Sequence, residues 1–94
     1  MALLSRDQVD EALSGDLAGW SQDGESITRS VTAASFMDGI ALVQRVAEAA
    51  EEMNHHPDID IRWTTVTFTL STHSEGGLTE NDLTLARKID ALAP

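Results

Sequence analysis

Three histidines are the side chains of this sequence best suited to chemistry at neutral pH. His55 and His56 are adjacent and are followed by Pro57, and His73 is the third histidine of the chain. Free imidazole loses its proton at about pH 6.5, so one ring can donate a proton while another accepts one. The sequence has no cysteine, which excludes disulfides, thiol catalysis and thiolate metal sites.

Two other uses of these histidines compete with proton transfer. Three histidines can bind a catalytic zinc ion. Adjacent histidines rarely chelate one ion, however, and this pair lacks the one-turn separation of the H-E-x-x-H pattern. The rings could also serve only as polar groups that cap the last carbonyls of a helix. We favour acid–base catalysis over both alternatives and predict no metal site.

The predicted elements bring the three histidines to one end of a sheet. Pro57 disfavours helical backbone at His56, so the histidine pair should lie where a helix passes into a strand. A hairpin closed near Thr64 would place the start of one strand beside the end of the next, where His73 lies. Four carboxylates should come within reach of this end: those of Glu51, Asp58, Glu75 and Asp82.

The clearest predicted element is a helix over residues 36–53, which Ser35 should cap at its N-terminus. Its apolar residues form two stripes, roughly 110° apart at about 100° per residue. The first stripe contains Phe36, Ile40, Val43, Ala47 and Ala50, and the second contains Leu42, Val46, Ala49 and Met53. The two stripes together are wider than one packing surface requires. We therefore expect one stripe to lie on the sheet and the other on a second helix, which could belong to another subunit.

Shorter helices are predicted at both ends of the chain. Ser5 and Gln8 have the spacing of a capping box, and the helix that follows should end near Leu17. Thr79 should cap a last helix, with Asp82 three residues on, and this helix should fray before Pro94.

Four strands are predicted between these helices. The turn at residues 23–24 predicts a hairpin whose second strand covers residues 27–32. Alternating apolar residues predict two more strands, over residues 59–63 and 66–70. The order of elements predicts an α+β fold, in which a four-stranded antiparallel sheet carries three helices packed on one face. The whole chain, residues 1–94, should form a single domain.

The composition excludes several classes of function. The chain has a formal net charge of −10, and such a surface should repel phosphate backbones, so nucleic acid is not an expected partner. No apolar run has the length of a membrane span, and the first residues lack the long apolar core of a signal peptide. We expect a soluble, cytoplasmic protein that makes no membrane contact.

The spacing of these residues resembles the pterin-4a-carbinolamine dehydratase family. Its signature residues match Glu51, His55-His56-Pro57, Trp63, His73 and Asp82, in register. The segments "VAEAAEEMNHHPDI" and "LSTHSEGGLTENDLTLARKID" are similar to the most characteristic blocks of the family, and the resemblance covers at least residues 20–89. It implies an α-β-β-α-β-β-α fold. It also implies dehydration of 4a-hydroxytetrahydropterin to quinonoid dihydropterin, in tetrahydrobiopterin recycling, with no metal, flavin or nicotinamide cofactor.

The resemblance also implies roles for individual residues. The catalytic set would be His55, His56, His73 and Asp82, with His55 and His73 transferring protons and Asp82 orienting one imidazole. Which histidine is the acid and which is the base stays open. The pterin would be bound by the three histidines and by Pro57, Thr72, Ser74 and Glu75.

Three residues at the edge of this pattern have other expected roles. Trp20 and Trp63 could wall the pocket, but ordinary core positions are the expected role of both. The family more often has tyrosine where this chain has Trp63, so a phenolic proton donor is lacking there. Asn54 stands where some relatives have an acidic residue, which weakens any role for a carboxylate at this position.

The resemblance leaves a second class of function open. Family members can act as dimerisation partners of a transcription factor, and dehydratase-like domains can act as assembly chaperones. These roles would use the apolar helix over residues 36–53 rather than the histidines. A metal-dependent hydrolase or metal carrier is a third possibility. In each case we expect a homodimer or homotetramer, because the helix has more apolar surface than one sheet covers.

Overall fold

The computed structural model describes residues 2–94, and its three α-helices begin where the sequence predicts. Helix α1 (Arg6–Ser14) follows Ser5, whose Oγ accepts a hydrogen bond from the backbone N–H of Gln8. Helix α2 (Phe36–Met53) follows Ser35, and helix α3 (Glu80–Leu92) follows Thr79. Side-chain caps of this kind satisfy N–H groups that have no partner within the helix, which is why they locate helix starts well.

The end of α1 was predicted too late. The helix ends at Ser14, and Gly15 caps it with backbone angles outside the helical region. The backbone N–H of Leu17 then bonds to the carbonyl of Ala12, 3.0 Å away, in a turn that places the Leu17 side chain in the core, fully buried. The apolar residue that seemed to extend the helix therefore belongs to the turn after it.

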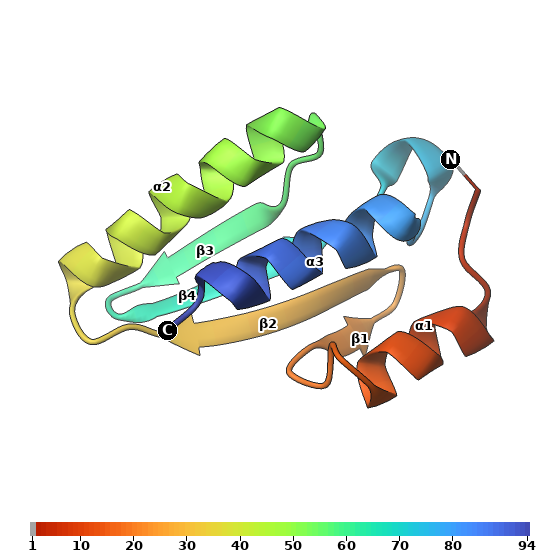
Figure 1. Ribbon diagram of the computed structural model, residues 1–94, viewed down its shortest axis with the longest axis horizontal. Helices are drawn as coiled ribbons and strands as arrows, with labels where there is room; N and C mark the ends of the chain where they lie inside the picture. The colour runs from red at the N-terminus through yellow and green to blue at the C-terminus, as the bar shows by residue number, and fades with distance from the viewer. Residues whose placement is uncertain (1) are drawn as a thin grey trace.

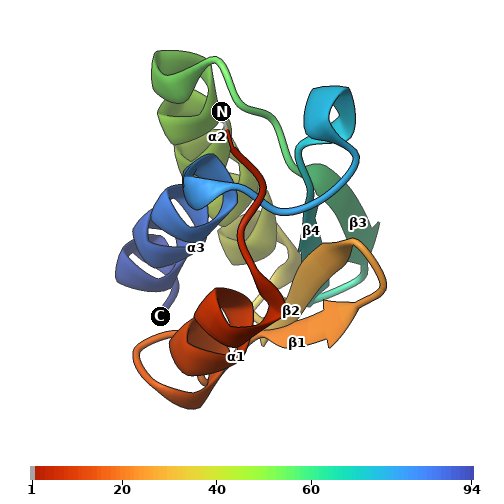
Figure 2. The same ribbon diagram turned by 90° about the vertical axis from the view of Figure 1, so that its right-hand side faces the viewer.

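Four strands form one antiparallel sheet in the order β1-β2-β4-β3. They are β1 (Ser21–Asp23), β2 (Ser26–Thr32), β3 (Asp58–Arg62) and β4 (Thr65–Leu70). Figures 1 and 2 show the sheet as one layer, with the three α-helices packed on the same side of it. The predicted α-β-β-α-β-β-α order and the α+β class are confirmed.

The two faces of the sheet differ in polarity. Along β4, Val66, Phe68 and Leu70 are fully buried, while the threonines between them are only partly buried. Side chains alternate across a strand, so the apolar set points to the helices and the hydroxyl set points away. Burying a side chain of this size contributes roughly 1.5–3 kcal/mol, and the core includes residues from all three helices.

Helix α2 covers the sheet with only part of its apolar surface. Gly39, Leu42, Val46 and Ala50 are buried, whereas Phe36 is 47% and Met37 is 70% exposed. Within this chain, α2 therefore buries the face that carries Leu42 and Val46, and the start of the helix keeps exposed apolar side chains.

The two tryptophans have different environments, and one prediction fails. Trp20 is 3% exposed and its Nε1–H donates to Asp90, 2.9 Å away, so its core role is confirmed. Trp63 was expected in strand and core, but it lies in the β3–β4 turn with φ of 50° and is 78% exposed. The turn needs a left-handed residue there, and this turns the ring out to solvent. Trp63 also lies at the opposite end of the hairpin from Asp58.

The β3–β4 pairing determines which segments meet at the histidine end. Asp58 lies opposite Thr69 at one end of the ladder, and Arg62 lies opposite Thr65 at the other. The chain before Asp58 and the chain after Leu70 therefore leave the sheet at the same end. In Figure 1, the end of α2 and the short 3₁₀ helix η1 (His73–Glu75) both lie at that end.

Candidate active site

The end of α2 directs the histidine pair away from the helix. Asn54 has the left-handed angles φ 50° and ψ 42°, and its N–H bonds to the carbonyls of Ala50 and Glu51. The N–H of His55 reaches back to the carbonyl of Ala50, 3.0 Å away. This pattern is a Schellman cap, in which asparagine is the usual substitute for glycine. Asn54 thus has a structural role, which its asparagine side chain next to a helix end could have indicated.

His55 is held by a buried carboxylate. Its Nε2 lies 2.6 Å from Oδ1 of Asp82 on α3. The His55 side chain is 11% exposed and that of Asp82 is fully buried. A contact this short between a ring and a carboxylate fixes the orientation of the imidazole. Of the three histidines, His55 is therefore the one with a defined and sheltered position.

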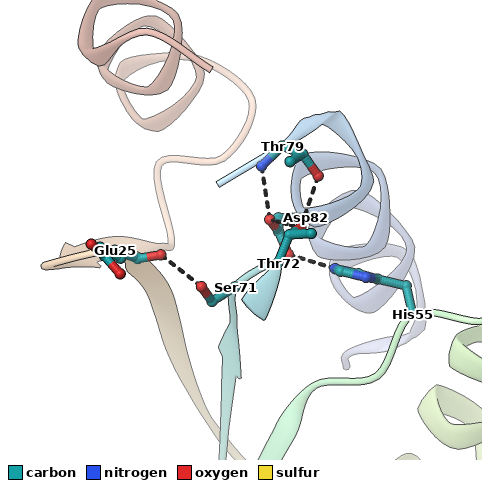
Figure 3. Close-up of polar contacts among 6 residues, drawn as sticks. All are labelled: Glu25, His55, Ser71, Thr72, Thr79 and Asp82. Carbon is teal, nitrogen blue, oxygen red and sulfur yellow. Dashed lines mark hydrogen bonds and ion pairs between the residues drawn. The ribbon is translucent and has the colours of Figure 1, made fainter. Parts of the chain in front are cut away.

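The other oxygen of Asp82 is bound by two threonines (Figure 3). Oδ2 accepts a hydrogen bond from Oγ1 of Thr72, at 2.7 Å, and one from the backbone N–H of Thr79, at 2.9 Å. The hydroxyl oxygens of Thr72 and Thr79 lie 2.8 Å apart. Asp82 is thus both a capping residue of α3 and the partner of His55, and it joins the end of β4 to the end of α2.

The partners of Asp82 indicate which ring nitrogen of His55 carries hydrogen. The hydroxyl of Thr72 and the N–H of Thr79 both donate, so an ionised carboxylate, which only accepts, satisfies them. The ring then donates from Nε2, and a neutral imidazole keeps its lone pair on Nδ1. Within residues 2–94, no buried side-chain nitrogen or oxygen lacks a partner, and Nδ1 makes no hydrogen bond. Nδ1 is therefore the ring nitrogen left to accept a proton.

His56 lies in a different environment from its neighbour. Its Nε2 pairs with the carboxylate of Glu51, one turn back on α2. The pair is exposed, with 55% of the His56 side chain and 75% of the Glu51 side chain accessible to solvent. The two adjacent rings therefore have separate carboxylate partners, one buried and one exposed.

His73 is exposed on η1, at the same end of the sheet as His55. The preceding residue, Thr72, bonds to Asp82, and its backbone N–H bonds to the carbonyl of Gly77, 2.8 Å away. Gly76 ends the short helix in the left-handed region, with φ of 72°. The Ser71 hydroxyl adds a hydrogen bond to the carbonyl of Glu25, at 2.9 Å (Figure 3). The segment that carries His73 is thus bonded to α3 through Asp82 and to the β1–β2 turn through Glu25.

Comparison with known protein families identifies the family of this chain. The family described as pterin 4 alpha carbinolamine dehydratase matches residues 2–92.

The chain belongs to this family.

Two curated relatives match nearly the whole chain. A protein of Mycobacteroides abscessus is 61% identical over 90 residues, covering 96% of this chain and 95% of the relative. A protein of Nocardia farcinica is 64% identical over 91 residues, covering 97% and 95%. Both are named provisionally as pterin-4-alpha-carbinolamine dehydratases.

Two solved structures resemble the fold. One, from Brucella melitensis, is described as a transcriptional coactivator/pterin dehydratase; it has a TM-score of 0.93 and 37% identity, and covers 99% of this chain and 100% of its own. The other is described as a pterin dehydratase-like protein identified as a RuBisCO assembly factor in the alpha-carboxysome. It has a TM-score of 0.69 and 27% identity, and covers 80% of this chain and 89% of its own.

The family signature residues are not all brought together in the same way. The structure joins His55, Asp82 and Thr72 by direct hydrogen bonds and pairs His56 with Glu51. His73 and Ser74 are exposed on η1. Within residues 2–94, no group of three or more histidine or carboxylate side chains is placed to hold a metal ion. No helix in the same range is long and apolar enough to cross a membrane.

The role of Thr72 is the feature that sequence reasoning did not see. The resemblance implied that Thr72 contacts the pterin, and that contact stays a prediction. In the structure the side chain is 9% exposed and its hydroxyl is bound to Asp82. The T-x-x-D spacing of residues 79–82 signalled the helix cap, but nothing in it signalled a second threonine reaching the same carboxylate from the segment after β4.

Proposed function

We propose that this protein dehydrates 4a-hydroxytetrahydropterin to quinonoid dihydropterin and water, in the cytoplasm, as a step of tetrahydrobiopterin recycling. The observation that carries the proposal is the hydrogen bond between His55 and the buried carboxylate of Asp82. It supports a ring that is held in one orientation, with a nitrogen open to a substrate. Membership of the pterin carbinolamine dehydratase family supports the choice of substrate.

The proposed reaction transfers two protons and changes no oxidation state. The N5–H bond breaks as its proton leaves, the electron pair forms the C4a=N5 double bond, and the C4a–O bond breaks. The leaving hydroxyl takes a second proton and departs as water. Because the atoms and charges balance without an oxidant or reductant, the proposal requires no cofactor and no metal.

We assign the two proton transfers to different histidines. His55 accepts the proton from N5 through Nδ1, because its Nε2 is bound to Asp82. His73, exposed on the anchored η1 loop, donates the proton to the leaving hydroxyl, and His56 orients the substrate. A base that is sheltered and an acid that is solvated can exchange their protons with water between turnovers, which general acid–base catalysis requires.

The proposed pterin-binding residues surround these histidines. Pro57 would form the floor, and Ser74 and Glu75 would contact the ring from η1. Thr72 would line the same site and also hold Asp82, since its hydroxyl, its N–H and its carbonyl are all bonded within the chain.

The test is the decay of chemically generated 4a-hydroxytetrahydropterin with and without the protein, in the presence of a chelator. We expect the wild type to accelerate the decay, and His55→Ala and His73→Ala to reduce kcat by roughly 10²–10⁴-fold, the usual contribution of a general acid or base. His56→Ala, which removes an exposed ring of the same type, serves as the matched variant and should lose less. No acceleration by the wild type would reject the dehydratase, and loss of activity on adding chelator would favour a metal enzyme.

We also propose that the chain forms a homodimer or homotetramer through the apolar part of α2 that it does not bury itself. The exposed Phe36 and Met37 support this proposal. The same surface supports the second candidate function, a non-catalytic dimerisation or assembly partner, since the carboxysome relative is described as an assembly factor. Light scattering should show a mass above that of one chain, and a Phe36→Ser, Met37→Ser variant should lower it. A monomer at all concentrations would contradict the oligomer.

A histidine variant distinguishes the two candidate functions. A His55→Ala variant should lose dehydration and keep the mass of the wild type in light scattering. If instead the wild type is inactive and oligomeric, the assembly role is favoured over the enzyme.

A further inference from the structure

We infer that Thr72 and Thr79 are positioning residues that hold His55, through Asp82, in the tautomer with hydrogen on Nε2 and a free lone pair on Nδ1. The catalytic consequence, that Nδ1 is the base, rests on the proposed dehydratase function. The tautomer itself is a property of the folded chain and can be measured without substrate.

The hydrogen atoms of the two threonines can be assigned by counting. A threonine hydroxyl has one hydrogen, and Thr72 donates its hydrogen to Oδ2 of Asp82, 2.7 Å away. The 2.8 Å contact between the two hydroxyl oxygens must then use the hydrogen of Thr79. The backbone N–H of Thr79 also points at Oδ2, 2.9 Å away. Two donors therefore converge on Oδ2, and the ring nitrogen is the group left to donate to Oδ1.

Burial keeps this arrangement from being rearranged by water. Thr79 and Asp82 are 0% exposed and Thr72 is 9% exposed. A carboxylate out of water is costly unless hydrogen bonds replace its hydration, and the two threonines supply that replacement. In surroundings of low dielectric these bonds are also stronger than on a surface. With both donors held at Oδ2, Oδ1 is the oxygen left to accept a hydrogen bond from Nε2 of His55.

The bond from Thr72 is not needed to start helix α3. A capping box uses the residue at the N-cap and the side chain three residues on, here Thr79 and Asp82. Thr72 lies ten residues before Asp82 in the chain, after the end of β4. Its hydroxyl reaches the carboxylate from a different element, as the close-up in Figure 3 shows. We therefore attribute the bond from Thr72 to the orientation of the carboxylate toward His55.

The test compares two substitutions at Thr72. Thr72→Val keeps the shape of the side chain and removes the hydroxyl, and Thr72→Ser keeps the hydroxyl. The matched control is Thr67→Val on β4, which removes a hydroxyl that pairs with Ser30, 2.8 Å away, on the outer face of the sheet. Each full-length protein is measured by ¹⁵N NMR of the His55 ring and by kcat and KM for 4a-hydroxytetrahydropterin.

The proposal expects the Nε2–H tautomer in the wild type, in Thr72→Ser and in Thr67→Val. Thr72→Val should show a mixture of tautomers and a kcat lower by roughly tenfold, the lower end of the losses seen for partners that orient metal-binding histidines, with KM little changed. A wild-type ring with hydrogen on Nδ1 overturns the proposal. So does a Thr72→Val protein whose ring spectrum and kcat match those of the wild type.

The proposal can still be decided if Thr72→Val does not fold or if the wild type is inactive. If Thr72→Val does not fold, the wild-type tautomer and the behaviour of Thr72→Ser decide, and a Thr72→Ser protein with a changed tautomer counts against the proposal. If the wild type does not dehydrate the pterin, the proposed function fails, but the ring spectra still decide whether the threonines position His55.

Discussion

Replacing Asp82 by asparagine should reverse the tautomer of His55 while leaving the shape of the site intact. The carboxylate accepts from three donors: Nε2–H of His55 at Oδ1, and the Thr72 hydroxyl and the Thr79 N–H at Oδ2. An asparagine side chain has one oxygen and one NH₂ group, so it can accept on one side only. The amide must therefore turn its NH₂ group either to the ring or to the threonines.

The structure favours the orientation with NH₂ toward the ring. The Thr72 hydroxyl could rotate to accept a hydrogen bond, but the backbone N–H of Thr79 is fixed and fully buried. Leaving that N–H without an acceptor costs about 1–3 kcal/mol. At about 1.4 kcal/mol per factor of ten, the orientation with NH₂ toward His55 is favoured by roughly 5- to 150-fold. The ring must then accept at Nε2 and carry its hydrogen on Nδ1, where it can no longer act as the base.

The expected result for Asp82→Asn is a fall in kcat of roughly 5- to 150-fold from the tautomer alone, with a smaller change in KM. The assay is the dehydration rate, combined with the ¹⁵N shifts of the His55 ring. Asp60→Asn is the matched control, because it makes the same chemical change at an exposed carboxylate of β3. An Asp82→Asn protein with wild-type kcat, or with hydrogen still on Nε2 of His55, would refute this reasoning.

Two smaller predictions concern stability and are measured by denaturant unfolding. Asn54→Ala should destabilise the protein by about 1–2 kcal/mol, since alanine carries a steric cost in the left-handed region, and Asn54→Gly should be close to neutral; equal loss in both variants would contradict the cap. Asp90→Ala should cost about 1–3 kcal/mol, because it leaves Nε1 of the buried Trp20 without its acceptor and also removes the partner of Arg29, 2.5 Å away; Asp90→Asn should recover part of this loss, and a neutral Asp90→Ala would contradict it.

The fold was predictable because each of its elements carries a local signal. The two-residue period of β4 and the serine and threonine caps depend on side chains that are neighbours in sequence, so they can be identified without the tertiary structure. The placement of the two histidine-bearing segments at one end of the sheet followed from one further step, the register of the β3–β4 hairpin. Asp58 lies opposite Thr69 in the structure, as a hairpin closed near Thr64 requires.

The errors lie where tertiary packing decides between two local options. Leu17 continues the apolar period of α1, but it lies in the turn after the helix, from which its side chain is buried in the core. Trp63 continues the alternation of β3, but the hairpin turn needs a residue with positive φ at that position and the ring is turned outward. In both cases the apolar pattern of the sequence extends beyond the end of the helix or strand.

The division of the site into a sheltered half and an open half follows from how each histidine is bonded. His55 has a buried partner from another helix, so its orientation is fixed by the fold before any substrate arrives. His56 pairs with Glu51 on the last turn and a half of α2, a side chain that is itself 75% exposed, and an exposed pair contributes little rigidity. The sequence shows two identical residues side by side, because a side chain's partner is a property of the fold. The adjacent histidines thus differ in the feature on which the proposed base role rests: of the two rings, that of His55 is bonded to a buried carboxylate, and that carboxylate is bonded to two threonines.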